Sequence, residues 1–259
     1  FFHAVPAGND NKKALTYAVR AAEHAASRFA YEDAISHYSR ALAVMESRGE
    51  SSDKQCELLL ALGEQQRKAG QVAAAKTTFR RVAEFARTLH GQGKKQQGTM
   101  FLARAALGFA PGLAGVGVNS GSHDASVIEL LQEALLAFGK KVSPLRARML
   151  GRLAMELYWT SAVDQREPLC REAVALARKL GDPAVLAETL YAQHAALRSP
   201  SNADERLVLT NEIITLAEKI GDKEQALRGR LWRIVDLAEL GEVSVADREF
   251  ETFRQQAEA

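Results

Sequence analysis

Apolar residues recur three or four positions apart along almost the whole chain, in segments separated by short breaks. This spacing places them on one face of an α-helix, and the alternation typical of strands is absent from the sequence. The pattern predicts helices over 12–29, 31–48, 54–69, 72–90, 99–110, 126–140, 145–160, 164–180, 183–198, 203–220, 223–240 and 243–258. The chain is therefore expected to be all-α.

The breaks between these segments have the chemistry of helix ends. Gly181-Asp182 and Gly221-Asp222 are the same junction used twice, about 40 residues apart. Glycine accepts the left-handed conformation that ends a helix, and the aspartate caps the helix that follows. Pro183 suits the first turn of its helix. The repeated junction indicates an internal repeat.

A second pattern runs through the same helices. The second hairpin contains, in order, Leu59, Leu62, Gly63, Gly70, Ala75 and Phe79. This order resembles the tetratricopeptide signature, in which a small residue lets two helices approach closely. Comparable positions are held by Ala34, Tyr38 and Ala41 in the first hairpin and by Gly241, Ala246, Phe250 and Phe253 in the last. HEAT-type repeats share the longer period, but they do not usually show this order.

The resemblance implies a tetratricopeptide-like solenoid, a right-handed superhelical array of about six antiparallel helix hairpins. Residues 1–259 are expected to form a single helical-repeat domain, and the opening Phe1-Phe2-His3 is interpreted as part of a longer protein. Helices 99–110 and 126–140 are expected to form an irregular hairpin around the long loop 111–125. Such a loop is either functional or an insertion without a partner.

Composition and charge argue against several classes of protein. Lys and Arg number 34 against 32 Asp and Glu, so the net charge is only +2. A surface that binds nucleic acid directly normally shows a clearer basic excess. The longest uncharged stretch, 105–123, is interrupted by glycines and Pro111, so no membrane helix is expected. Cys56 and Cys170 form no ligand-spaced pair, which favours a reduced, cytoplasmic protein.

Helical segments rich in Ala, Leu and Arg carry a further resemblance, at 18–23, 29–34, 143–148, 172–178 and 231–237. They resemble the helical-repeat region of large bacterial regulatory ATPases, which include LuxR-type transcriptional regulators. The resemblance spans almost the whole chain. It implies a non-catalytic sensor and protein-interaction scaffold for signal transduction, with nucleotide chemistry carried by a nucleotide-binding module in the same parent chain.

The chain itself lacks the parts of an ATPase, since no G-x-x-x-x-G-K-[ST] loop occurs. The segment 91–95 comes nearest, but it follows a predicted helix, whereas a phosphate loop follows a strand. A polar helix connection is therefore expected there. The histidines are scattered without a metal-binding motif, and Asp33 with His37 suits a solvated or packed pair. We predict no catalytic residue, no metal site, no cofactor and no ATP binding by the isolated chain.

Binding is the activity that the pattern favours. Stacked hairpins create a concave surface lined by the first helix of each pair, and arginine and aromatic side chains commonly anchor recognition. In the second half of the chain such positions are held by Arg148, Met155, Tyr158, Trp159, Tyr191, Arg198, Arg228 and Trp232. We expect them to bind a protein or a small-molecule signal. Alternatively, the two tryptophans are core residues between repeats and the arginines are solvated.

Two classes of function remain open. The array is either the sensor arm of a regulator or a stand-alone peptide-docking adaptor. Co-chaperone adaptors hold a C-terminal carboxylate with an Asn/Lys/Arg clamp on their first helices. The asparagines of this chain fall mostly at predicted helix ends and in loops, so that clamp is missing.

Overall fold

The computed structural model describes residues 9–47, 53–110, 124–160 and 162–258. Every regular element in these ranges is helical, and no strand occurs among them. None of the described helices is both long and apolar enough to span a membrane. The same ranges contain twelve α-helices: α1 (Asn9–Ser27), α2 (Tyr31–Glu46), α3 (Asp53–Lys68), α4 (Val72–Gly91), α5 (Lys95–Phe109), α6 (Ala125–Phe138), α7 (Pro144–Glu156), α8 (Val163–Leu180), α9 (Pro183–Ala196), α10 (Ala203–Ile220), α11 (Lys223–Glu239) and α12 (Val243–Glu258).

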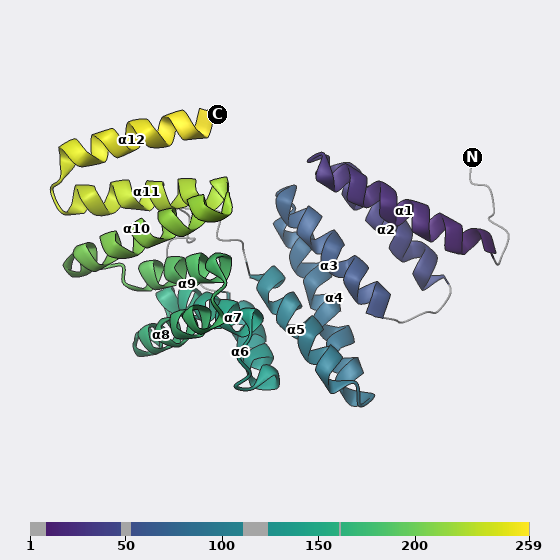
Figure 1. Ribbon diagram of the computed structural model, residues 1–259. Coiled ribbons are helices and arrows are strands. Elements are labelled where there is room, and N and C mark those ends of the chain that lie inside the picture. Colours follow the sequence, from purple (N-terminus) through teal and green to yellow (C-terminus); the bar gives the residue numbers. More distant parts are fainter. Residues whose placement is uncertain (1–8, 48–52, 111–123, 161, 259) are drawn as a thin grey trace. The chain divides into compact units, whose positions relative to one another are not determined.

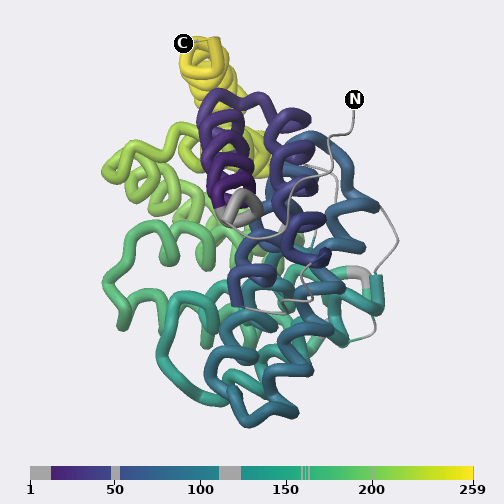
Figure 2. Tube along the Cα trace, turned by 90° about the vertical axis from the view of Figure 1, so that its right-hand side faces the viewer, coloured from purple at the N-terminus to yellow at the C-terminus, as the bar shows by residue number. Residues whose placement is uncertain are grey.

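The chain divides into two compact units, unit 1 at Phe1–Val118 and unit 2 at Asn119–Ala259. Unit 1 holds α1 to α5 and unit 2 holds α6 to α12, and within each unit every helix packs on the next (Figure 1 and Figure 2). The predicted fold class, an all-α array of consecutively packed helices, is confirmed. A right-handed superhelix through the whole chain and a single domain over 1–259 remain predictions.

One expected hairpin falls at the division between the units. Helices α5 and α6 belong to different units, and each packs within its own: α5 on α3 and α4, and α6 on α7. Most of the loop predicted to join them, residues 111–123, lies outside the described residues, as does Phe1-Phe2-His3.

Local chemistry at the helix ends matches the sequence prediction. Gly181 and Gly221 adopt φ values of 68° and 73°, in the left-handed region. The carboxylate of Asp182 accepts hydrogen bonds from the backbone N–H of Ala184 and Val185, and Asp222 accepts one from that of Gln225. These bonds satisfy N–H groups that a helix start leaves free, so each aspartate is the predicted cap.

Most helix bounds agree with the prediction to within three residues, and the largest differences are at the start of α5 and the end of α7. Helix α5 begins at Lys95 instead of 99, because Gly93 at φ 82° ends the connection from α4 early. That connection is polar, as expected for residues 91–95. Helix α7 ends at Glu156 and continues as the 3-10 turn η1 (Leu157–Trp159), and α9 ends at Ala196. Arg198 therefore follows α9 instead of lying on it.

Small residues let the helices of unit 1 approach as the tetratricopeptide-like pattern predicts. A Cβ added at Gly63 on α3 would lie 2.8 Å from the Cζ of Phe79 on α4. A Cβ at Gly108 on α5 would lie 2.3 Å from the same ring. The Phe79 ring, only 2% exposed, is thus enclosed between two glycines. Phe250, expected at the corresponding packing position, is instead 50% exposed, because no described helix follows α12 as α5 follows α4.

Phe29, between α1 and α2, has an unusual backbone conformation. Its φ is 61°, whereas Gly70, at the corresponding junction between α3 and α4, has φ 75°. The N–H of Ala30 bonds to the carbonyl of Ala25, as that of Gln71 bonds to Gln66, so both junctions share one helix-ending motif. The left-handed region costs a side chain with a Cβ about 1 kcal/mol or more. The Phe29 ring is also 77% exposed.

We expect Phe29→Gly to stabilise unit 1 by about 0.5–1 kcal/mol, because glycine adopts this conformation without strain. The edge-to-face contact of Phe29 with Tyr31, with ring centroids 6.3 Å apart, would be lost, but it is solvent-exposed. Phe29→Ala is the matched control, since it loses the ring and keeps the Cβ. Urea unfolding measures both variants. If both destabilise equally, the Phe29 ring matters more than its backbone.

Candidate recognition site

The predicted site residues all lie in unit 2, on the first helices of its hairpins (α7, α9 and α11) or just after them. Their positions are Arg148 and Met155 on α7, Tyr158 in η1, Tyr191 on α9, Arg198 after α9, and Arg228 and Trp232 on α11. Met155 is half-buried. Trp159 belongs to η1, but its side chain lies outside the described part of the chain.

Small side chains lie between α7 and α9, whereas large side chains lie between α9 and α11. Between α7 and α9 the approach is close, since a Cβ on Gly151 would lie 3.0 Å from that of Ala192. Between α9 and α11 the space is filled by Tyr191, His194 and Trp232. The indole Nε1 of Trp232 donates to the hydroxyl of Tyr191 at 3.2 Å, and its ring lies 5.4 Å from that of His194. Tyr191 and Trp232, 4% and 8% exposed, are therefore core residues between hairpins.

Three arginines stack on aromatic rings among the described residues of unit 2. The guanidinium carbon of Arg198 lies 4.6 Å from the ring centroid of Trp232, and that of Arg228 lies 5.5 Å from Tyr191. The guanidinium of Arg166, on α8, lies 4.7 Å from the ring of Tyr158. A cation over a ring face is attracted by the negative potential of that face. We call these six residues the stacked-arginine site: Tyr158, Arg166, Tyr191, Arg198, Arg228 and Trp232.

Arg148 has a different environment. Its Nε and Nη2 donate to the two carboxylate oxygens of Glu188 on α9, at 2.6 and 3.1 Å. The hydrogen bonds to Glu188 raise the pKa of Arg148 above its ordinary value. These two hydrogen bonds occupy the pair of guanidinium N–H donors with which Arg148 would otherwise bind a ligand. The structure therefore does not bring Arg148 together with the stacked-arginine site, and its pairing links α7 to α9.

Contacts between successive first helices follow the repeat length inferred from the sequence. Arg148 and Glu188 are 40 residues apart, Tyr191 and Trp232 are 41 apart, and His194 and Asp236 are 42 apart. Each pair joins one first helix to the next. The period of about 40 residues is therefore a spatial repeat in unit 2.

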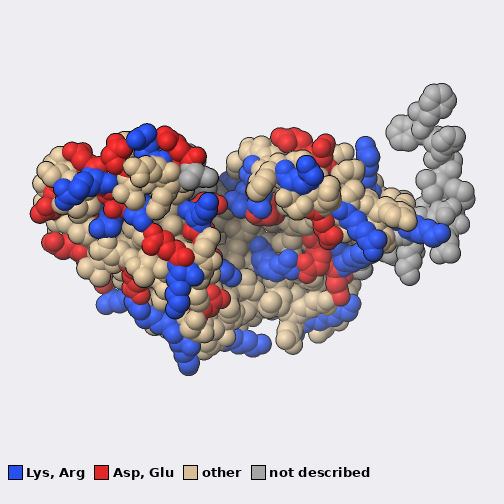
Figure 3. Space-filling view, turned by 45° about the horizontal axis from the view of Figure 1, so that its top comes forward, with Lys and Arg blue, Asp and Glu red and all other residues tan. Residues whose placement is uncertain are grey.

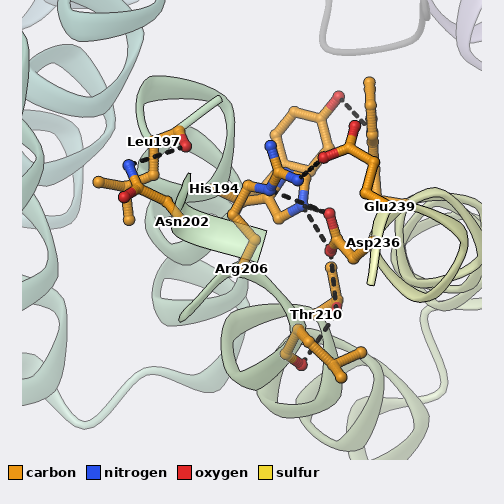
Figure 4. A network of polar contacts seen from close by, with 10 residues as sticks. His194, Leu197, Asn202, Arg206, Thr210, Asp236 and Glu239 are labelled. Carbon is orange, nitrogen blue, oxygen red and sulfur yellow. Dashed lines mark hydrogen bonds and ion pairs between the residues drawn. The ribbon is translucent and has the colours of Figure 1, made fainter. Parts of the chain in front are cut away.

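A buried ionic network centred on Asp236 (Figure 4) adjoins the stacked-arginine site through the contact of His194 with Trp232. His194 from α9 and Arg206 from α10 point toward the carboxylate of Asp236 on α11, and all three are at most 2% exposed. His194 Nε2 lies 2.9 and 3.2 Å from the two oxygens of Asp236. Arg206 Nε forms an ion pair with Asp236 at 3.1 Å, although its N–H is not aligned as a hydrogen bond. Arg206 also pairs with Glu239.

The network joins α9, α10 and α11, because the side chains of His194, Arg206, Asp236 and Glu239 pair with one another. The carboxylate of Asp236 only accepts hydrogen bonds, and the arginine only donates. Arg206 and Arg166 were not among the predicted residues, because they lie on second helices and the repeat pattern places the concave surface on first helices. His194 and Asp236 offered a usable signal, since they sit one repeat apart on successive first helices.

The cysteines and the possible metal ligands offer no reactive site among the described residues either. Burial raises the pKa of the Cys170 thiol to about 12 and that of Cys56 to about 11, so neither is a thiolate nucleophile at neutral pH. Cys170 and Cys56 are each 1% exposed and lie in the core. Among the described residues, no group of three or more His, Cys, Asp and Glu side chains is placed to hold a metal ion.

Surface charge is mixed in both units. Residues 1–118 contain 16 Lys and Arg against 10 Asp and Glu, and residues 119–259 contain 18 against 22. On the face drawn in Figure 3, the two signs alternate over each unit. Unit 2 therefore has no basic excess of the kind that direct nucleic-acid binding requires.

Comparisons with known proteins bear on the fold. No protein-family model and no curated protein matches the chain. The crystal structure of BtubC (BKLC) from P. vanneervenii is similar, with a TM-score of 0.62 and 15% identity over 96% of this chain and 92% of that one. A thermophilic TPR protein from Thermus thermophilus aligns over 91% of this chain and 98% of its own, at 17% identity. Its TM-score of 0.30 is too low to support an argument. The likeness to BtubC concerns the fold alone.

Proposed function

We propose that this chain is a non-catalytic scaffold that recognises a protein partner through the stacked-arginine site of unit 2. The observation that carries the proposal is Arg198, an exposed guanidinium held over the buried ring of Trp232. Arginine and aromatic side chains that are fixed in place often supply most of the binding energy of an interface. The surrounding core supports this role, since Trp232 is itself held by Tyr191 and His194.

We further propose that the scaffold is the sensor arm of a bacterial regulatory ATPase or LuxR-type transcriptional regulator. The resemblance of its helical segments to such regulators supports this context. Nucleotide chemistry would then reside in another module of the parent chain, and the array would convert partner binding into a signal. The closed polar network around Asp236 and the buried thiols are consistent with a scaffold that performs no chemistry itself.

Binding and stability measured together test the recognition role. Peptides selected from a random library on the purified chain supply the probe. Arg198→Ala and Tyr158→Ala should each weaken binding of a selected peptide about 30-fold or more, the loss typical of an anchor residue. The melting temperature of Arg198→Ala should stay unchanged, since this side chain is exposed. Arg248→Ala, which removes an exposed arginine on α12, is the matched control.

Two results would contradict the proposal. One is a failure of the wild-type chain to select any peptide. The other is unchanged affinity in folded Arg198→Ala and Tyr158→Ala, which would move recognition away from this site.

A further inference from the structure

Arg198 differs from the arginines that cross between helices in unit 2. Apart from Arg166, those arginines pair with carboxylates, as in Arg146–Glu172, Arg148–Glu188, Arg178–Glu212, Arg206–Asp236 and Arg230–Glu249. Arg198 has no carboxylate partner among the described residues, and its neighbour is the ring of Trp232. A charged side chain therefore remains at the surface with its hydrogen-bonding capacity unused.

The guanidinium of Arg198 is exposed, so its N–H donors remain accessible while it lies over the ring of Trp232. Arginine carries five such donors in a planar arrangement that matches the two oxygens of a carboxylate. The ring beneath is 8% exposed and held by hydrogen bonding to Tyr191. The contact with Trp232 already restricts the side chain of Arg198, so less conformational entropy is lost when a ligand binds.

A second arginine reaches the same end of α9. Arg166 stacks on Tyr158, and its Nη2 donates to the backbone carbonyl of Ala196, two residues before Arg198. Its Nε is buried and has no hydrogen-bond partner among the described residues. The C-terminal end of α9 therefore carries two stacked guanidinium groups, and both have unused donors.

We propose that the end of α9 binds an aspartate or glutamate side chain of a partner polypeptide, with Arg198 as the receiving group. This inference rests on the proposed recognition function and names the chemistry of its partner. A charge-assisted, two-bond contact of this kind is among the stronger hydrogen-bonded interactions in proteins.

One observation favours a side-chain carboxylate over a phosphate. Unit 2 has more acidic than basic residues, and its net negative charge opposes a phosphate dianion more strongly than the single charge of a carboxylate.

The test uses peptides displayed with their C-termini fused to the carrier, so that they offer only side-chain carboxylates. Wild-type chain and Arg248→Ala should both select peptides with Asp or Glu at one fixed position, and Arg198→Ala should lose that preference. For one selected peptide, changing the acidic residue to its amide should weaken binding to wild type about 10-fold to 100-fold. The same change should have little effect on Arg198→Ala, because the two groups act as a pair. Arg198→Lys should restore only part of the affinity.

The results distinguish a failure of carboxylate binding by Arg198 from a failure of the recognition function on which it rests. If no peptide is selected by the wild-type chain, the recognition function fails and the inference fails with it. If peptides are selected without acidic preference, or if the preference survives in Arg198→Ala, only the inference fails. Tighter binding of a phosphoserine peptide than of its glutamate counterpart would show that the site receives phosphate, which would also overturn the inference.

Discussion

Asp236→Ala is expected to destabilise unit 2 by about 3–5 kcal/mol, because removing one partner from a buried ionic network leaves the groups around it only partly compensated. Arg206 would remain charged at 2% exposure, with Glu239 as its remaining carboxylate, and His194 would lose its acceptor. Because the three residues come from α9, α10 and α11, the loss should affect all three helices. Urea unfolding followed by circular dichroism measures the effect.

Asp247→Ala is the matched control for this variant. Asp247 is exposed on α12, and its removal should change the unfolding free energy by no more than about 0.5 kcal/mol. A loss below about 1 kcal/mol for Asp236→Ala would mean that the network contributes little to holding the three helices together.

Gly63→Leu is expected to destabilise unit 1 by about 1–3 kcal/mol through overpacking. The first carbon of the new side chain would lie within 2.8 Å of the Phe79 ring. Gly108 on α5 approaches the same ring closely, so the ring has little room to move away. The helices α3 and α4 must separate instead, and their shared core must open.

Gly91→Leu provides the comparison for this prediction. Gly91 lies at the end of α4, and a Cβ added there would meet no described atom within 4 Å. The change should be neutral or slightly stabilising, since leucine has the higher helix propensity. Equal melting temperatures for the two leucine variants would show that the small-residue pattern does not reflect helix packing.

Features decided by neighbouring residues were predictable from the sequence. The caps at Asp182 and Asp222 need only the chain a few positions on, and the glycines before them need only their own backbone. The role of Gly63 was also predictable, since the repeat supplied its partner Phe79. Phe29 was not, because it occupies a conformation that other junctions give to glycine, and no local rule favours phenylalanine there.

The site was predicted in part. The sequence placed Tyr191 and Trp232 on successive first helices, and the structure joins them by a hydrogen bond. It could not decide which arginines find carboxylates, because that depends on side chains about one repeat away. Arg148 meets Glu188, whereas Arg198 meets a ring and no described carboxylate. This difference in pairing is what singles out Arg198 among the predicted residues.

The fluorescence of Trp232 offers the most direct test of recognition at the stacked-arginine site. The chain has two tryptophans, so Trp159→Phe leaves Trp232 as the single emitter. A peptide that engages Arg198 should disturb the stack 4.6 Å above the indole and change its emission saturably. The midpoint of that change should equal the Kd measured by an independent method. Tight peptide binding that leaves Trp232 emission unchanged would place recognition elsewhere and contradict the account.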